Sequence, residues 1–189
     1  MAEAEQQLKS LLANFTSFSA EFRQTVTDAL GEELQSAEGK LFLQRPNLLH
    51  WQSLPPNELT LIADGETVWY ADPFAEQVIA MDQNQAAANH PIMLLADVTA
   101  TQWADYTVTS VKNQQFQLSA KSEQSDVIEM RVLFNEGQLA EIRILDRMEQ
   151  TNRLQFNSPL SNVQLSPDLF VFSLPEGFDL DDQRNSTTP

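Results

Sequence analysis

The sequence predicts a mainly β protein with helices, in which an antiparallel sheet curves into a barrel or a sandwich. Two observations support this prediction. Most of the chain alternates apolar and polar residues in short runs separated by turns, which is typical of antiparallel strands. Only two segments have a helical pattern, too few to cover both faces of a parallel sheet. The 189 residues are enough to bury a substantial core, and we expect a single domain over residues 1–189.

The first helix and the first strands are predicted from a change of period. An N-terminal helix is expected within residues 2–15, because apolar residues recur there at helical spacing: Leu8, Leu11, Leu12 and Phe15. From residue 18 to 26 the period changes to two, which predicts a half-buried strand. A second strand is expected over residues 34–45. Pro46 lacks a backbone donor and interrupts this strand, which resumes at residues 49–53.

A hairpin and a short apolar helix are predicted next. Asp64-Gly65 is the strongest hairpin signal in the chain, and it joins strands at residues 59–63 and 67–71. After a strand at residues 77–81, the alternating pattern lapses. The run from Pro91 to Asp97 predicts a short helix, with proline in its first turn. A strand is the competing interpretation, because short apolar runs are ambiguous.

Alternation returns near Trp103 and continues through most of the C-terminal half. It predicts strands around a series of apolar residues: Val108, Leu118, Val132, Ile142 and Leu154. Residues 158–168 are expected to form a loop. A last strand is predicted over residues 170–174 and ends at Pro175. Residues 176–189 form an acidic and polar C-terminal segment.

The composition excludes several classes of partner. The formal net charge of −16, from 27 acidic and 11 basic residues, argues against nucleic acid and against anionic lipid surfaces. The chain has no cysteine, and no apolar run approaches the ~20 residues of a membrane helix. Its start lacks the basic and apolar regions of a signal peptide, which fits either a cytoplasmic protein or a mature exported form.

The sequence contains no recognisable catalytic motif. His50 and His90 are the only histidines, and they lack metal-ligand spacing, so we interpret both as structural and expect no metal. No G-x-S-x-G elbow and no glycine-rich phosphate loop occur, and no pair of carboxylates stands out. We therefore expect no catalytic residues, no cofactor and no enzymatic activity.

Arg45 is unusual because it lies in phase with apolar strand residues. Alternate strand side chains share a face, so Arg45 should face the same way as Leu41 and Leu43. An unpaired buried guanidinium is costly. The arginine therefore needs a hydrogen-bonding partner or a wet cavity.

The chain also has more apolar residues than one covered sheet face needs. They include Phe15, Phe18, Phe22, residues 41–51, Trp69, Tyr70, Phe74 and residues 92–95. Each residue taken singly is best explained as core, which leaves a purely structural or interaction domain as one interpretation. Taken together, with two helices to cap a curved sheet, the set favours a concave apolar ligand site.

Several motifs, in order along the chain, resemble the outer-membrane lipoprotein carrier family, LolA. The run from Gly39 to Trp51 resembles its G-x-[apolar]-x-[apolar]-x-R-P-x-x-F-x-W stretch. Further matching segments are Phe18–Gln24, Asp64–Trp69, Asp72–Gln77, Pro91–Leu95, Phe170–Gly177 and Asp181–Gln183. The resemblance covers almost the whole chain, and the ordered set is more specific than any one motif.

The resemblance implies an incomplete, unclosed antiparallel β-barrel with a helical lid, residues 91–97, over a hydrophobic cavity. It assigns the lid contact to Arg45, which would hydrogen-bond the lid backbone in the closed state. It assigns the acyl-chain cavity to Phe15, Phe18, Phe22, Leu41, Leu43, Leu49, Trp51, Trp69, Ile92, Met93, Leu94 and Leu95. The family usually has an aromatic residue at the position of Leu49, so this chain should cover less of the cavity there.

The function implied by the resemblance is that of a periplasmic chaperone. Such a carrier, acting as a monomer, shields the acyl chains of triacylated lipoproteins released by an inner-membrane ABC transporter. It then transfers them to an outer-membrane lipoprotein receptor. The alternative is a module of the same fold that binds other lipids or fatty acids.

Overall fold

The structure is a computed structural model that describes residues 2–185. Its helical segments are α1 (Ala2–Ala13), α2 (Gln83–Asn89), α3 (Met93–Ala96), η1 (Thr101–Asp105) and η2 (Pro167–Phe170). Its strands are β1 (Ser17–Thr27), β2 (Glu33–Gln44), β3 (Leu48–Ser53), β4 (Leu59–Ala63), β5 (Thr67–Asp72), β6 (Gln77–Asp82), β7 (Tyr106–Lys112), β8 (Gln115–Ala120), β9 (Val127–Asn135), β10 (Gln138–Asp146), β11 (Thr151–Ser161) and β12 (Asp179–Asp182).

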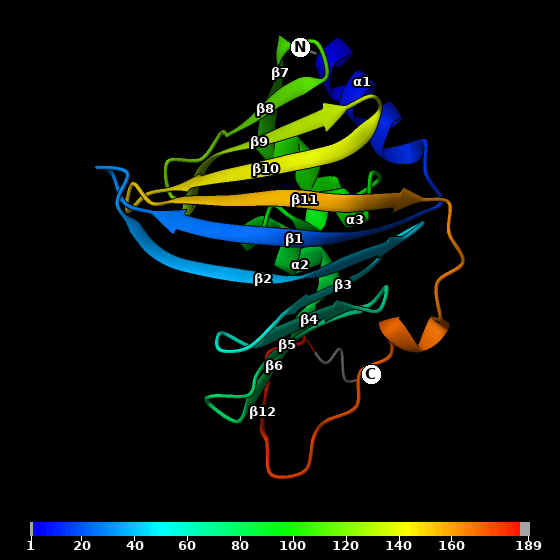
Figure 1. Cartoon of the computed structure of the whole chain (residues 1–189), viewed down its shortest axis with the longest axis vertical. Helices are drawn as coiled ribbons and strands as arrows, with labels where there is room; N and C mark the ends of the chain where they lie inside the picture. Colours follow the sequence, from blue (N-terminus) through cyan, green and yellow to red (C-terminus); the bar gives the residue numbers. More distant parts are fainter. Residues whose placement is uncertain (1, 186–189) are drawn as a thin grey trace.

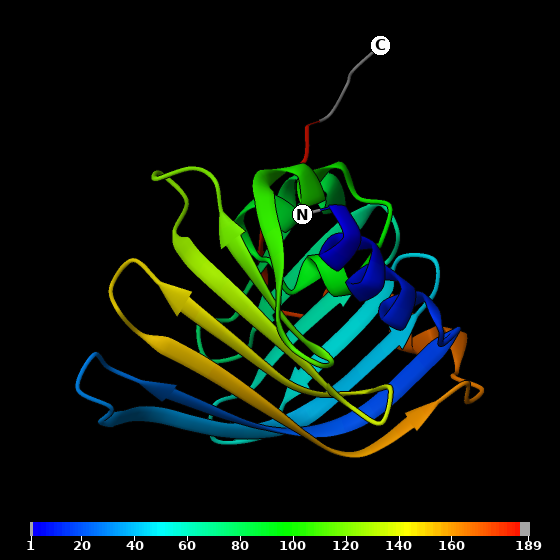
Figure 2. The same cartoon turned by 90° about the horizontal axis from the view of Figure 1, so that it is seen from above.

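All of these strands belong to one curved sheet. Its order is β12-β6-β5-β4-β3-β2-β1-β11-β10-β9-β8-β7, so β7 and β12 are edges that do not pair with each other. The sheet bends around α1, α2, α3 and η1, which occupy its concave side, whereas η2 lies outside it (Figure 1; Figure 2). The predicted unclosed β-barrel with helices is therefore confirmed. One correction concerns β12, which pairs with β6 in parallel, so the sheet is not wholly antiparallel.

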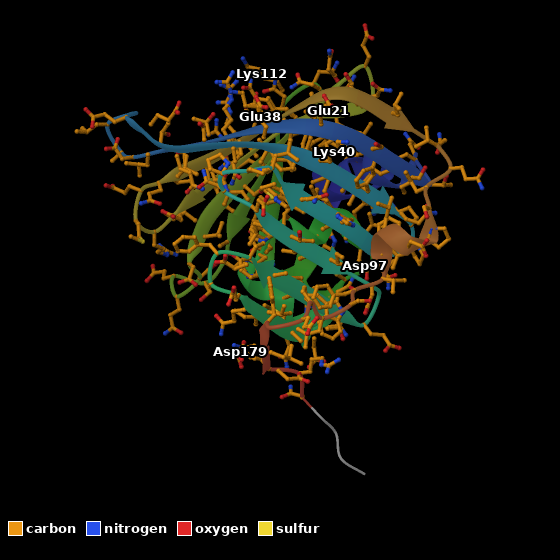
Figure 3. All side chains as sticks on the ribbon, turned by 60° about the horizontal axis from the view of Figure 1, so that its bottom comes forward. Glu21, Glu38, Lys40, Asp97, Lys112 and Asp179 are labelled. Atoms are coloured by element: carbon orange, nitrogen blue, oxygen red, sulfur yellow. The ribbon has the colours of Figure 1, made fainter. Side chains whose placement is uncertain are left out.

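The two sides of the sheet follow the alternation of residues in each strand. Phe18, Ala20 and Phe22 on β1 are buried on the concave side. Glu21 and Lys40 lie opposite each other on β1 and β2 and point outward, as Figure 3 shows. Opposite charges at directly paired positions stabilise a sheet modestly. The concave side thus holds the main core, and the convex side is charged over these strands.

Gly39 allows the concave side to pack closely at the middle of β2. A Cβ atom at this position would lie 2.1 Å from the Gln52 carbonyl oxygen and 2.4 Å from Cζ of Phe22. No side chain fits that space, so the Phe22 ring lies directly against the glycine. On its other side the same ring packs on Trp51, with ring centroids 4.4 Å apart.

The chain after β11 covers the outer face of β3 to β6. Beneath it, Ile62, Val78 and Ala80 are buried although they point away from the main core. His50, also on this face, contacts the Leu169 carbonyl oxygen through Nδ1 and packs edge-on against Phe42. Within residues 2–185, no helix is both long and apolar enough to cross a lipid bilayer.

Several predicted elements differ from the structure. Pro46 does not interrupt a continuing strand; it lies in a turn, and β3 runs back antiparallel to β2. The lapse after residue 82 is a helix, α2. The predicted helix over residues 91–97 has α-helical geometry only over Met93–Ala96, preceded by a turn.

The C-terminal predictions differ most. Residues 171–174 are not a strand but an extended stretch without ladder pairing. The last strand is β12, whose sequence Asp-Leu-Asp-Asp has no strand signal. Strand β11 continues to Ser161, into the predicted loop. Residues 186–189 of the predicted C-terminal segment lie outside the described residues.

Candidate functional site

Arg45 joins the sheet to two helix ends. Its backbone N–H donates to the Thr16 carbonyl at 2.9 Å, which fixes the end of β2 beside β1. Its Nη1 donates to the carbonyls of Leu95 and Ala96 at 2.6 and 2.9 Å, and Nη2 and Nε donate to that of Leu12 at 2.7 and 3.2 Å. Carbonyls in the last turn of a helix have no partner inside the helix, so one guanidinium supplies donors to α1 and α3 together.

Apart from these carbonyls and the Asp97 carboxylate, Arg45 has apolar surroundings. Its guanidinium lies 4.7 Å from the ring centroid of Phe15, a favourable cation–π distance. Burial lowers the pKa of Arg45 to about 10, against the opposing effect of the Asp97 carboxylate. The guanidinium therefore stays charged at neutral pH. Its positive charge interacts favourably with the negative C-terminal ends of the dipoles of α1 and α3. Five donors in a fixed fork make arginine suited to this junction.

A second polar junction lies close by, at the start of α2. The Gln83 side chain is buried, with 7% of its surface exposed. Its Nε2 donates to the Asn47 carbonyl at 2.7 Å, and its Oε1 accepts from the Gly65 N–H at 2.9 Å. Gln83 thus connects α2 to the turns of two hairpins. We call the region around Arg45 and Gln83 the Arg45 end of the barrel.

Helix α3, in the segment predicted as a lid, fills the concave side next to Arg45. Met93, Leu94 and Leu95 are almost completely buried, and Ile92 is 9% exposed. They form one core cluster with most of the residues predicted for the cavity: Phe15, Phe18, Phe22, Leu41, Leu43, Leu49 and Trp51. Leu41 pairs with Trp51 and Leu43 with Leu49, so these four side chains share a face.

An open pocket continues from this cluster at the opposite end of the barrel. Its volume is about 440 Å³, and its lining includes Trp51, Leu61, Tyr70, Ile92, Ile144 and Leu154. Burial and the charge of Asp72 raise the pKa of Tyr70, so its hydroxyl is neutral. The indole N–H of Trp51 donates to the Ser53 hydroxyl at 3.1 Å, which leaves the ring as an apolar wall. We call this region the open end.

The structure does not place Trp69 with the other predicted cavity residues. Because β5 turns Val68 and Tyr70 inward, Trp69 faces the outer side of the sheet. There it stacks on Phe172 with centroids 4.9 Å apart, and its indole N–H donates to Asp64 at 3.0 Å. The alternation within residues 67–71 already contained this information.

Other residues of the site were not anticipated. Leu61 and Ile144 carry strand signals but no sign that they border a pocket. Gln83 lies in the polar and alanine-rich run where the alternation lapsed, and no pattern in the sequence marks it as a buried connector. The contact of Leu12 with Arg45 uses a backbone carbonyl, which a sequence pattern cannot reveal.

These features define a class of protein. A curved, unclosed sheet holds an apolar interior, short helices cover it, and a single arginine joins two of those helices to the sheet. An apolar interior covered by short helices is typical of proteins that bind apolar ligands.

Sequence comparison identifies the family within that class. Residues 13–173 match the family described as outer membrane lipoprotein carrier protein LolA. The outer-membrane lipoprotein carrier protein of Shewanella sp. (strain W3-18-1) is 37% identical, with 98% of this chain and 89% of that protein covered. That of Serratia proteamaculans (strain 568) is 36% identical, with 97% and 90% covered. The chain belongs to the LolA family, which confirms the predicted resemblance.

A solved structure agrees with the fold. The LolA superfamily protein from Nitrosomonas europaea aligns with a TM-score of 0.50 at 8% identity, covering 90% of this chain and 97% of that one. At this identity the likeness concerns the fold alone.

Proposed function

We propose that this protein is a periplasmic carrier that encloses the acyl chains of lipoproteins and delivers them to the outer membrane. The observation that carries the proposal is the junction at Arg45, which joins the covering helices to a barrel with an apolar interior. The names of its relatives support lipoproteins as the cargo. A triacylated lipoprotein, an inner-membrane ABC transporter and an outer-membrane receptor complete the proposed route, in which the protein binds and releases without catalysis.

The energetics favour a cover that can move. Each methylene group removed from water contributes ~0.8 kcal/mol, so exposing one acyl chain costs on the order of 10 kcal/mol. The pocket at the open end is about 440 Å³, while Leu94 and Leu95 occupy the interior beyond it. Several acyl chains therefore enter only if α3 withdraws from the interior. Contacts with the chains then replace the contacts of the lid, which keeps binding reversible.

A holding assay tests the proposal. A detergent-solubilised triacylated lipoprotein is diluted below the critical micelle concentration with or without the chain. We expect a soluble complex on gel filtration only when the chain is present. Because the sequence has no cysteine, a cysteine pair introduced between α3 and β3, which lie in contact, forms a single removable cross-link. The oxidised variant should lose the complex, and reduction should restore it.

The alternative, a module for other lipids, gives a different result. In such a module a free fatty acid would displace an environment-sensitive dye from the chain. In the holding assay, however, the lipoprotein would remain in the aggregated fraction. That outcome would refute the lipoprotein carrier and retain the lipid-binding site.

A further inference from the structure

The inner faces of three adjacent strands, β2, β1 and β11, each carry an amide residue among apolar ones at the open end. On β1 the series Phe18, Ala20 and Phe22 continues with Gln24. On β11 the inward residues Leu154 and Phe156 are preceded by Asn152. Gln35 on β2 pairs with Val26, which pairs in turn with Asn152, so these positions form one row across the sheet. On β1 the residue of this row is Val26, and Gln24 lies one inward position before it, opposite Leu154, so the amides of the three strands lie within one step of a common row.

The amide side chains line the same pocket as the apolar wall. Gln24, Gln35, Gln150 and Asn152 all border the 440 Å³ pocket, next to Ile144 and Leu154. Gln24 Nε2 donates to Asn152 Oδ1 at 3.0 Å. Within residues 2–185 neither side chain forms another hydrogen bond, so Gln24 Oε1 can accept and Asn152 Nδ2 can donate. The pair is half-buried and held in place, which prepares it to bind a neutral polar group.

The charges around this rim are unsuited to an anion. Among the described residues that line the pocket, none is a lysine or an arginine. Asp146 also borders it and accepts from the N–H groups of Met148 and Gln150, so its negative charge is fixed at the edge. Desolvation lowers the pKa of His90 below the ordinary histidine value near 6.5, against the opposing effect of Asp126. A phosphate at this edge would meet a carboxylate and neutral groups.

We propose that Gln24, Gln35, Gln150 and Asn152 form a neutral subsite that binds the ester and amide groups of the cargo's lipid head and discriminates against anionic phospholipids. This inference rests on the proposed function. The acyl chains of a triacylated lipoprotein end in ester and amide groups, whose carbonyls accept hydrogen bonds and whose amide N–H donates one. A site that bonds such groups rejects a ligand that leaves its buried polar atoms unpaired. Phospholipids share the apolar chains and their ester groups, but they lack the acyl amide N–H, and their phosphate would lie beside Asp146 without a cation, so discrimination occurs at the head.

The test compares two soluble probes with matched short acyl chains: a neutral diacylglyceryl N-acyl cysteine amide and an anionic phosphatidylglycerol. Each displaces an environment-sensitive apolar dye from the full chain. The wild type should bind the neutral probe more tightly. The double variant Gln24→Leu/Asn152→Leu should bind the neutral probe roughly 10-fold more weakly, from the loss of about two hydrogen bonds, and still bind the dye. Gln155→Leu, half-buried on the outer face of the same strand, is the matched control and should change neither affinity.

A second variant tests the charge argument. Gln24→Lys adds a cation at the rim and should improve binding of phosphatidylglycerol roughly 10-fold. Equal affinity of the wild type for both probes, or an unchanged affinity of the double variant, would overturn the subsite. Failure of every probe to displace the dye, together with a failed holding assay, would instead refute the proposed function.

Discussion

The two ends of the barrel are built differently. At the Arg45 end, polar junctions tie the helices to hairpin turns, and the lid side chains beneath them are fully buried. At the open end, no comparable junction occurs within residues 2–185, and a pocket of about 440 Å³ adjoins the same lid helix. Helix α3 is therefore held by polar contacts at the Arg45 end and borders a pocket at the other end. In the proposed carrier, full opening requires the loss of the Arg45 contacts.

The largest expected effect is that of Arg45→Met. This change removes the donors to three helix-end carbonyls and should lower the free energy of unfolding by about 3 kcal/mol. It should also raise dye access to the interior. Urea unfolding and dye titration measure both effects. Arg45→Lys keeps the charge but not the fork, and should fall between wild type and Arg45→Met. Unchanged stability together with unchanged dye access would contradict the anchoring role.

Truncation of lid side chains should separate the two ends directly. Leu95 is fully buried at the Arg45 end, so Leu95→Ala should cost roughly 3 kcal/mol. Ile92 borders the pocket, where the structure already has a void, so Ile92→Ala should cost about 1 kcal/mol. Denaturant midpoints of the two variants provide the comparison. Equal losses would show that the lid is held uniformly along its length.

Gln83 provides a smaller test of the anchored end. Gln83→Ala leaves the Asn47 carbonyl and the Gly65 N–H without their partner, and should cost about 2 kcal/mol. Gln85→Ala, an exposed glutamine on the same helix, should stay within ~0.5 kcal/mol of wild type. If both variants lost the same stability, helix propensity rather than the junction would explain the effect.

The smallest expected effect is the contribution of Asp64 to stability, which should be lost at acidic pH. Partial burial raises the pKa of Asp64, but hydrogen bonds from Thr67, Trp69 and Glu66 outweigh it, so the net pKa is lowered. A lowered carboxyl pKa stabilises the fold above the ordinary value near 3.9, and this contribution is lost as the pH falls through the lower folded value. Solvent screening limits it to about 0.5 kcal/mol. Asp64→Asn should flatten that part of the stability profile, and an unaltered profile would refute the assignment.

The alternation of apolar and polar residues predicted most of the strands. It also identified Arg45 as an unusual residue. Alternation located the strands up to β11, because each has one face on the core. The phase of Arg45 with Leu41 and Leu43 indicated a charge in need of partners, which the helix ends supply. The role of these residues in binding cargo remains a prediction.

The errors have a common physical cause in long-range packing. Strand β12 forms because its backbone pairs with β6. Its own side chains have no pattern that predicts this pairing. Helix α2 is rich in alanine and glutamine, which favour a helix without producing an apolar period. Trp69 was assigned to the cavity as an apolar residue and by resemblance, without regard to its strand phase, and Phe172 covers the outer face on which it lies.

The three tryptophans have a practical consequence for spectroscopy. Trp51 borders the pocket against Phe22, Trp103 is buried beside Lys9, and Trp69 lies between Phe172 and Arg184 on the outer face. Three variants, each retaining a single tryptophan, would therefore report on three places. Trp51 would report on the pocket, Trp103 on the segment after α3, and Trp69 on the outer face. Their fluorescence would time the entry of cargo, the movement of the lid region and any rearrangement of the outer face as separate events.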